Sequence, residues 1–214
     1  MTTFSLKILA VISMTLDHVG MLFFPQSILL RAVGRLAFPI FAFLTAESCR
    51  KTHDPDAYIQ RLLCCGIISE IPFDLFCFGT IFSPSGQNIF FTLFLGALAI
   101  RLWQLQGNRR FFSLLPLVAA DMFAVDYGFL GVATIVLLFL ALERQEPVSA
   151  GGILVINCIL FSVIYGWPVQ LAGIAALVPL HFYNGRRGRS WKRFFYSFYP
   201  VHLLLLWLIF QILS

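Results

Sequence analysis

The stretch Phe4–Phe24, FSLKILAVISMTLDHVGMLFF, is an almost uninterrupted apolar run. A helix needs about 20 such residues to cross the hydrocarbon core of a bilayer, so this run predicts a transmembrane helix. Lys7, Asp17 and His18 are its ionisable residues. Ionisable side chains inside a membrane are costly and usually face the protein interior, where other groups pair with them. We therefore expect partners for Asp17 and His18 on other helices.

The composition extends this prediction to the whole chain. Of its 214 residues, 59% are hydrophobic and only 12% are charged, whereas a soluble domain carries about 25% charged residues. No Pro/Gly/Ser-rich linker divides the sequence, so we expect a single domain, residues 1–214. The fold class is all-α, a polytopic transmembrane helix bundle. The net charge of +5 reflects basic loops rather than nucleic-acid binding, because no basic cluster has the interleaved exposed aromatics on which single strands stack.

Further apolar runs follow the first one. Gly and Pro interrupt helices, so the last parts of the chain are expected to break at Asp126-Tyr127-Gly128 and Gly166-Trp167-Pro168. The sequence predicts about nine helices, with eight or ten as alternatives. The runs are 4–24, 33–49, 58–78, 88–106, 111–125, 128–142, 150–167, 168–183 and 194–213.

Loop charges predict the orientation. Basic residues gather around Arg50-Lys51, at Arg109-Arg110 and in the segment 186–193, whereas the loops 79–87 and 165–168 carry no charge. Cytoplasmic loops are the ones rich in Lys and Arg. We therefore expect a bacterial inner-membrane protein whose N-terminus is cytoplasmic, with surrounding membrane lipid as a partner.

The same topology brings the remaining ionisable residues to one level of the bundle. Asp17 and His18 are adjacent on a helix, so their side chains point about 100° apart and should meet different partners. His181 and His202 are interpreted as packed residues of their helices. The ionisable residues that we assign to the intramembrane polar set are Asp17, His18, Arg35, Glu47, Glu70, Asp74, Asp121 and His202.

Spacing refines the polar layer. Glu70 and Asp74 share one helix face, as do Asn88 and Thr92, because residues four apart are neighbours on a helix. Two carboxylates so close repel each other, which calls for a cation such as Arg35 or for a raised pKa. Asp126 and Tyr127 complete the layer, although Asp126-Tyr127-Gly128 is more simply a turn between short helices.

Lys7 and His18 lie on one helical stripe, about 16 Å apart along the axis. A long donor with an anionic head and a reactive end, such as an acyl-coenzyme A, would span that distance. The segment FYNGRRGRSWKR, residues 182–193, offers Asn184, Arg186 and Arg187 to phosphates. Its simpler interpretation is a basic loop that sets orientation.

Several phrases together resemble the TraX family, in the same order and over almost the whole chain. Ser48 stands where the family pattern leads us to expect Gly. The phrases are Asp17-His18 in the first run, GRLAFPIFAFLTAE (34–47), RLLCCGIISEIPFDL (61–75), NIFFTLFLG (88–96), VDYGFLGV (125–132), FYNGRRG (182–188) and FFYSFYPVHLL (194–204).

The resemblance implies transfer of an acetyl group from acetyl-CoA to an acceptor at the membrane. The broader group of membrane acyltransferases has a basic residue about ten positions before a first-helix His, and Lys7 and His18 match it. This implies His18 as the catalytic residue and Lys7 as a donor contact. The acceptor is a pilin N-terminus, a glycan hydroxyl or a lipid headgroup.

The chemistry of the polar set suits that reaction. A neutral imidazole at His18 is a suitable general base, with Glu70 or Asp121 as the catalytic partner that orients it or stabilises its charge. Asp17 is a further catalytic candidate. Arg35 is a candidate donor contact or oxyanion group. We expect no metal, because no ligand spacing supports one.

The main alternative is an ion-coupled transporter, since buried carboxylates also form proton relays; a scaffold protein is a third interpretation. The candidate acceptor-binding residues are Asp74, Asn88, Thr92, Asp126 and Tyr127.

Overall fold

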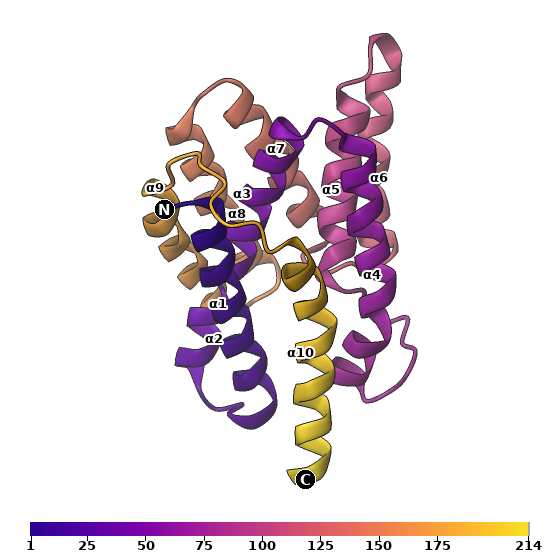
Figure 1. Cartoon of the computed structure of the whole chain (residues 1–214), viewed down its shortest axis with the longest axis vertical. Coiled ribbons are helices and arrows are strands. Elements are labelled where there is room, and N and C mark those ends of the chain that lie inside the picture. Colours follow the sequence, from indigo (N-terminus) through magenta and orange to yellow (C-terminus); the bar gives the residue numbers. More distant parts are fainter. Residues whose placement is uncertain (214) are drawn as a thin grey trace. The chain divides into compact units, whose positions relative to one another are not determined.

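The computed structural model describes residues 1–213, and in these residues helices carry the whole fold (Figure 1). The all-α prediction is confirmed, and each of the nine apolar runs contains a helical segment. The helices are α1 (Thr3–Phe23), α2 (Ile28–Gly34), α3 (Ala37–Lys51), α4 (Pro55–Phe78), α5 (Ile89–Trp103), η1 (Gly107–Leu114, a 3-10 helix), α6 (Leu115–Met122), α7 (Gly128–Glu143), α8 (Pro147–Ile164), η2 (Pro168–Ala176, a 3-10 helix), α9 (Leu177–His181) and α10 (Lys192–Leu213).

Within the described residues, four helical segments are long and apolar enough to cross a membrane. They are α1, the segment Ile28–Lys51 that contains α2 and α3, α8, and α10. Such segments need about 20 mostly apolar residues. These long apolar helices indicate a membrane protein.

The two expected breaks are present. Tyr127 and Gly128 have φ values of 62° and 46°, in the left-handed region that ends a regular helix. Gly166 has a φ of 62°, and η2 begins at Pro168 after Trp167. The sequence therefore marked both places where the long apolar segments fold back as short helices.

Contacts divide the chain into two compact units. The first contains Met1–Phe41 and the chain from Leu154 onward, and the second contains Ala42–Ile153. In the first unit α1 packs against α2 and α10, and α2 packs against η2. Whether the chain behaves as a single domain stays a prediction.

Small residues bring α1 and α2 close together. A Cβ atom added to Gly20 would lie 2.8 Å from the Leu30 Cβ atom, and one added to Gly34 would clash with the Asp17 side chain. The Ser13 hydroxyl donates a hydrogen bond to the Val33 carbonyl at 2.5 Å. The close approach therefore presses Asp17 against α2.

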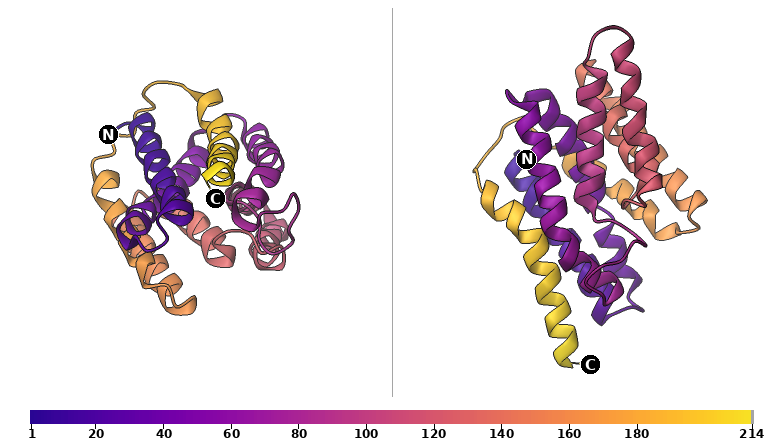
Figure 2. Two further views of the ribbon diagram at one scale, coloured as in Figure 1. Left: turned by 90° about the horizontal axis from the view of Figure 1, so that it is seen from below. Right: turned by 90° about the vertical axis from the view of Figure 1, so that its right-hand side faces the viewer.

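The second unit packs α5 against α4, α6 and α7, and Figure 2 shows these magenta to salmon helices from two further directions. Gly96 permits the α5–α7 contact, because a Cβ there would lie 2.7 Å from the Ile135 side chain. A buried apolar cluster forms beside it, consisting of Leu95, Ala99, Ala120, Val125 and Val132.

Candidate functional site

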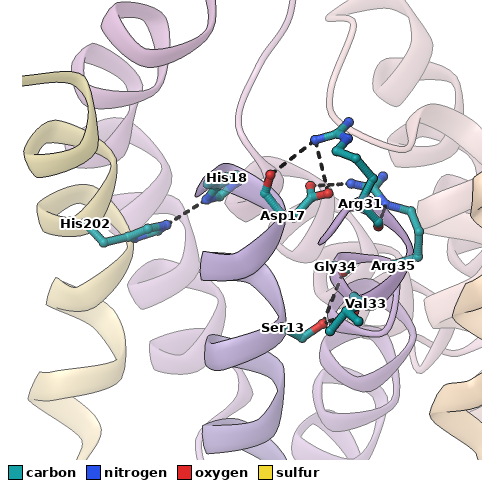
Figure 3. Close-up of polar contacts among 8 residues, drawn as sticks. All are labelled: Ser13, Asp17, His18, Arg31, Val33, Gly34, Arg35 and His202. Carbon is teal, nitrogen blue, oxygen red and sulfur yellow. Dashed lines mark hydrogen bonds and ion pairs between the residues drawn. The ribbon is translucent and has the colours of Figure 1, made fainter. Parts of the chain in front are cut away.

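Asp17 and His18 leave α1 toward different elements, as Figure 3 shows. His18 points to His202 on α10, and Asp17 points to Arg31 and Arg35 at α2. The expectation that adjacent helix positions meet different partners is confirmed. The partners themselves are all in the first unit.

The two imidazoles form a hydrogen-bonded pair. His18 Nδ1 and His202 Nε2 are 2.8 Å apart, and the two rings meet edge to edge, with their planes 19° apart and their centroids 5.0 Å apart. His202 Nδ1 lies 2.9 Å from the Phe198 carbonyl oxygen. Tyr199 approaches both rings edge-on, and both Tyr199 and His202 are buried.

The partners fix the tautomers of a neutral pair. A carbonyl oxygen only accepts, so His202 Nδ1 carries the hydrogen and donates it to Phe198. His202 Nε2 is then the acceptor, and His18 Nδ1 donates to it. A neutral imidazole has one donor and one acceptor nitrogen. The lone pair of His18 therefore lies on Nε2, which is the atom that a general base uses.

Asp17 is the centre of an ion cluster with two guanidinium groups. Arg31 Nη1 lies 3.1 Å from Asp17 Oδ1, and Arg35 Nη2 contacts Asp17 Oδ2. The three side chains are at most 17% exposed. Arg31 also lies over the Trp167 ring, 5.5 Å from its centroid. Two cations thus stand next to the residue that precedes His18.

Lys7 lies at the other end of the α1–α10 contact. Its Nζ atom is 5.4 Å from the centroid of the Phe195 ring. Because Lys7 meets Phe195 and His18 meets His202, α1 and α10 run in the same direction along their contact.

The segment after α9 is tied to the start of α1. The amide of Thr3 donates to the Arg186 carbonyl at 2.9 Å, and that of Phe4 donates to the Arg187 carbonyl at 3.1 Å. Gly188 has a φ of 69°, and a Cβ there would lie 2.7 Å from the Thr2 hydroxyl. The Asn184 side chain accepts from the Arg186 amide at 3.1 Å. These contacts hold the basic segment beside the helix that carries Lys7 and His18.

In the second unit, Glu70 and Asn88 form the contact that brings α4 to the start of α5. The side-chain amide group of Asn88 donates a hydrogen bond to a Glu70 carboxylate oxygen and another to the Gly66 carbonyl at 2.9 Å. Asp74 accepts from the Ser83 amide at 2.9 Å. The other oxygen of each carboxylate is buried and lacks a hydrogen bond among the described residues. Such atoms suit a proton, a water or a ligand.

The remaining predicted residues shape the turn between α6 and α7. Asp121 Oδ1 accepts from the Phe129 amide at 2.7 Å, which satisfies a donor at the start of α7. The Thr92 hydroxyl donates to the Asp126 carbonyl, and the Asp126 amide donates to the Gln87 carbonyl at 2.9 Å. The interpretation of Asp126-Tyr127-Gly128 as a turn is confirmed. A role for these residues in acceptor binding stays a prediction.

The structure thus brings together Lys7, Asp17, His18, Arg35 and the segment 184–187 in the first unit. The second unit holds the predicted residues Glu70, Asp74, Asn88, Thr92, Asp121, Asp126 and Tyr127.

Sequence reasoning missed His202 as the partner of His18, and it missed Arg31. The only available signal for His202 was that it is ionisable and lies within an apolar run. Arg35 pairs with Asp17, whereas the sequence predicts it as the cation that offsets the repulsion between Glu70 and Asp74. The orienting role expected for Glu70 or Asp121 stays a prediction. In residues 1–213, no group of three or more His, Cys, Asp or Glu side chains is placed to hold a metal ion.

Comparisons with known proteins place these residues in a family. The family model for the TraX protein matches residues 3–210. The probable fimbrial assembly protein FimC (serogroup H1) of Dichelobacter nodosus is 31% identical, over 96% of this chain and 94% of its own length. An uncharacterised protein of Rickettsia prowazekii is 29% identical, over 84% of this chain and 68% of its own length. No solved structure matches significantly. Because the family model covers nearly the whole chain, this protein belongs to the TraX family.

Proposed function

We propose that this protein is a membrane-embedded acetyltransferase that moves an acetyl group from acetyl-CoA to an amine or hydroxyl of the cell envelope. The observation that carries the proposal is the hydrogen bond between His18 and His202, 2.8 Å long. It holds His18 as the tautomer with its lone pair on Nε2. His202 acts through His18 and is a positioning residue.

The reaction needs one proton acceptor. His18 Nε2 takes the proton of the acceptor amine or hydroxyl while that atom forms a bond to the acetyl carbon. The carbon–sulfur bond breaks, and the imidazolium of His18 returns its proton to the departing thiolate. The hydrogen bond to His202 spreads the positive charge that His18 carries in between.

The donor lies along α1. Lys7 and His18 point in nearly the same direction and are about 16 Å apart along the axis. Lys7, Asn184, Arg186 and Arg187 bind the phosphates of acetyl-CoA, because Lys and Arg are the phosphate-binding side chains. The backbone contacts of Arg186 and Arg187 with the start of α1 keep these cations near Lys7.

The other polar residues serve the acceptor and the developing charge. Arg35, which pairs with Asp17, the residue before His18 in the chain, stabilises the oxyanion, the largest single contribution in many acyl transfers. Asp17 contributes to catalysis by holding the Arg35 guanidinium group in place. The orienting or charge-stabilising role expected of Glu70 or Asp121 stays a prediction, because both residues belong to the second unit. The same holds for the acceptor-binding role expected of Asp74, Asn88, Thr92, Asp126 and Tyr127.

The name of the Dichelobacter nodosus relative links it to fimbrial assembly. We accordingly expect a pilin or fimbrial subunit as the acceptor, most simply through its N-terminal amine. The enzyme lies in the inner membrane with a cytoplasmic N-terminus, which suits a cytoplasmic donor and an acceptor from the other side.

Purified protein in lipid nanodiscs with radiolabelled acetyl-CoA tests the proposal. His18→Ala should keep donor binding and helical content but lose transfer by at least about 100-fold, the contribution of a general base. His53→Ala, a change at an exposed histidine, is the matched control and should transfer normally. Wild-type transfer by a folded His18→Ala protein would refute the mechanism. Mass spectrometry of envelope proteins from a deletion strain identifies the acceptor by loss of an acetyl mark.

An ion-coupled transporter is the second candidate. The Glu70–Asp74 pair, with one buried and unsatisfied oxygen on each carboxylate, favours it, since intramembrane carboxylates form proton relays. Proton uptake into liposomes without any binding of acetyl-CoA would support the transporter and exclude the acetyltransferase.

A further inference from the structure

An apolar groove of about 310 Å³ follows the contact between α1 and α10. Side chains between Ile8 and Leu16 line it on α1, and Phe194 and Phe198 line it on α10. The Thr15 hydroxyl that lines the groove already donates a hydrogen bond to the Val11 carbonyl at 2.9 Å. A ligand with amide or hydroxyl groups would lose hydrogen bonds in such a groove. The groove therefore suits a hydrocarbon chain.

The groove lies beside the Lys7–His18 stripe rather than on it. With about 100° per residue, Lys7 and His18 point within about 20° of each other. Of the α1 residues that line the groove, Val11 points about 40° away from Lys7 and the other four point about 80–180° away by the same rule. An occupant of the groove thus lies next to the path assigned to the acetyl donor and does not replace it.

The outer wall of the groove is open. Ile12 is 53% exposed and Phe194 is 40% exposed, and both helices are long and apolar enough to cross a bilayer. The surroundings of such helices are lipid acyl chains, so a chain from the membrane reaches the groove directly.

Positive charge stands at one end of the groove. Lys192 and Arg193 are exposed at the first turn of α10. They precede Phe194 and Phe198 by about 2–9 Å along the helix axis. The exposed Trp191 adjoins them, as aromatic residues do at the headgroup level. An anionic headgroup at this end would place its chain in the groove.

The inner wall connects the groove to the histidine pair. The Phe198 ring stacks on the His202 ring with centroids 4.8 Å apart, and His202 bonds to His18. An occupant that presses on Phe198 therefore supports the position of both imidazoles.

We propose that the α1–α10 groove binds one acyl chain of an anionic phospholipid, whose headgroup is held by Lys192 and Arg193, and that this lipid supports the His18–His202 pair. The binding itself does not depend on the proposed acetyl transfer. Failure of either proposal is therefore recognisable separately.

Native mass spectrometry of the full chain with phosphatidylglycerol or phosphatidylcholine tests the binding. Wild type should retain one phosphatidylglycerol and far less phosphatidylcholine. The double change Lys192→Glu, Arg193→Glu should weaken retention at least about tenfold, because each cation near a headgroup contributes to anionic-lipid affinity. Arg109→Glu, Arg110→Glu, a basic pair exposed on η1, should leave it unchanged.

A groove-filling variant gives a second, independent readout. Ile12→Trp should prevent lipid retention and keep the His18 Nδ1–H signal in the NMR spectrum of the delipidated protein, whereas wild type should lose that signal without lipid. Ile67→Trp, at a similarly exposed α4 position, is the control. Equal retention of both lipids, unchanged retention in the Lys192/Arg193 or Ile12 variants, or displacement of the lipid by acetyl-CoA would overturn the proposal.

Discussion

Asp17 and His18 are neighbours in the chain, yet their side chains connect α1 to two different helices. Asp17 pairs with Arg31 and Arg35 at α2, and His18 pairs with His202 on α10. One dipeptide thereby fixes the rotation of α1 about its axis, because turning the helix would break both sets of contacts. The ion cluster and the imidazole pair are therefore linked through adjacent residues of α1.

Removing the Asp17 carboxylate should destabilise the protein strongly. In Asp17→Ala the guanidinium groups of Arg31 and Arg35 lose their shared anion in a mostly buried place. Breaking a buried ion pair in this way costs about 3–5 kcal/mol. Thermal unfolding in detergent measures the loss. Asp56→Ala removes the exposed pair with Arg101 and should leave the midpoint unchanged; equal effects of the two changes would contradict a buried cluster.

Gly34 tests the closeness of α1 and α2. An added methyl group would overlap the Asp17 side chain, and overpacking of this kind costs about 1–3 kcal/mol. Gly34→Ala should therefore lower the unfolding midpoint although alanine is the better helix former. The control is Gly152→Ala, where a Cβ meets no atom within 4 Å and the midpoint should hold or rise. A neutral Gly34→Ala would show that α2 lies further from Asp17.

The Asn88 side chain should contribute strongly to the stability of the second unit. Its side chain caps α5 by accepting from the Phe90 amide at 3.1 Å and donates to Gly66 and Glu70. Asn88→Ala loses the cap and leaves buried acceptors unsatisfied, a cost of about 2–4 kcal/mol. Asn88→Asp keeps the cap but sets a further carboxylate directly against Glu70. It should unfold at a lower temperature than Asn88→Ala near neutral pH, and the reverse order would exclude the observed amide orientation.

Local chemistry made much of the fold predictable. The apolar runs required helices, and the Gly and Pro residues at 126–128 and 166–168 located the breaks where Tyr127, Gly128 and Gly166 adopt positive φ. The divergence of Asp17 and His18 followed from the helical period alone. The Glu70–Asn88 contact joins two residues that we had placed in one polar layer.

The pairing of distant helices was not predictable in the same way. His18 and His202 are 184 positions apart, and apolar helices have no local signal for which neighbour they choose. Arg31 lies in α2, before the apolar run 33–49, and no pattern in the sequence marks it as a partner of Asp17. Arg35 was correctly considered ionic, but two carboxylates four residues apart made Glu70 and Asp74 the more obvious partners.

Lys7 should affect donor binding more than chemistry. Lys7→Met removes one cation about 16 Å from His18 along α1, too far to act on the reacting atoms. We expect a KM for acetyl-CoA raised about tenfold with little change in kcat, the pattern of lost uniform binding. Arg144→Met, at an exposed position after α7, should change neither. A fall in kcat with unchanged KM would contradict this prediction and would indicate that Lys7 acts in the catalytic step and not in donor binding.

The decisive prediction concerns the acceptor atom on His202. His202→Phe preserves an aromatic ring beside Phe198 but removes the atom that accepts from His18 Nδ1. Without it, His18 is free to adopt the other tautomer, and kcat should fall by about 100-fold or more at similar KM, because a misoriented base loses most of its contribution. His202→Gln supplies an amide oxygen that accepts the same hydrogen, so it should restore at least about a tenth of the activity.

Nitrogen NMR of labelled histidines follows the tautomer directly: His18 should carry its proton on Nδ1 in wild type and in His202→Gln, and should lose this preference in His202→Phe. If both variants were equally inactive with the His18 tautomer unchanged, His202 would act only by packing, and the assignment of His18 Nε2 as the base would lose its support.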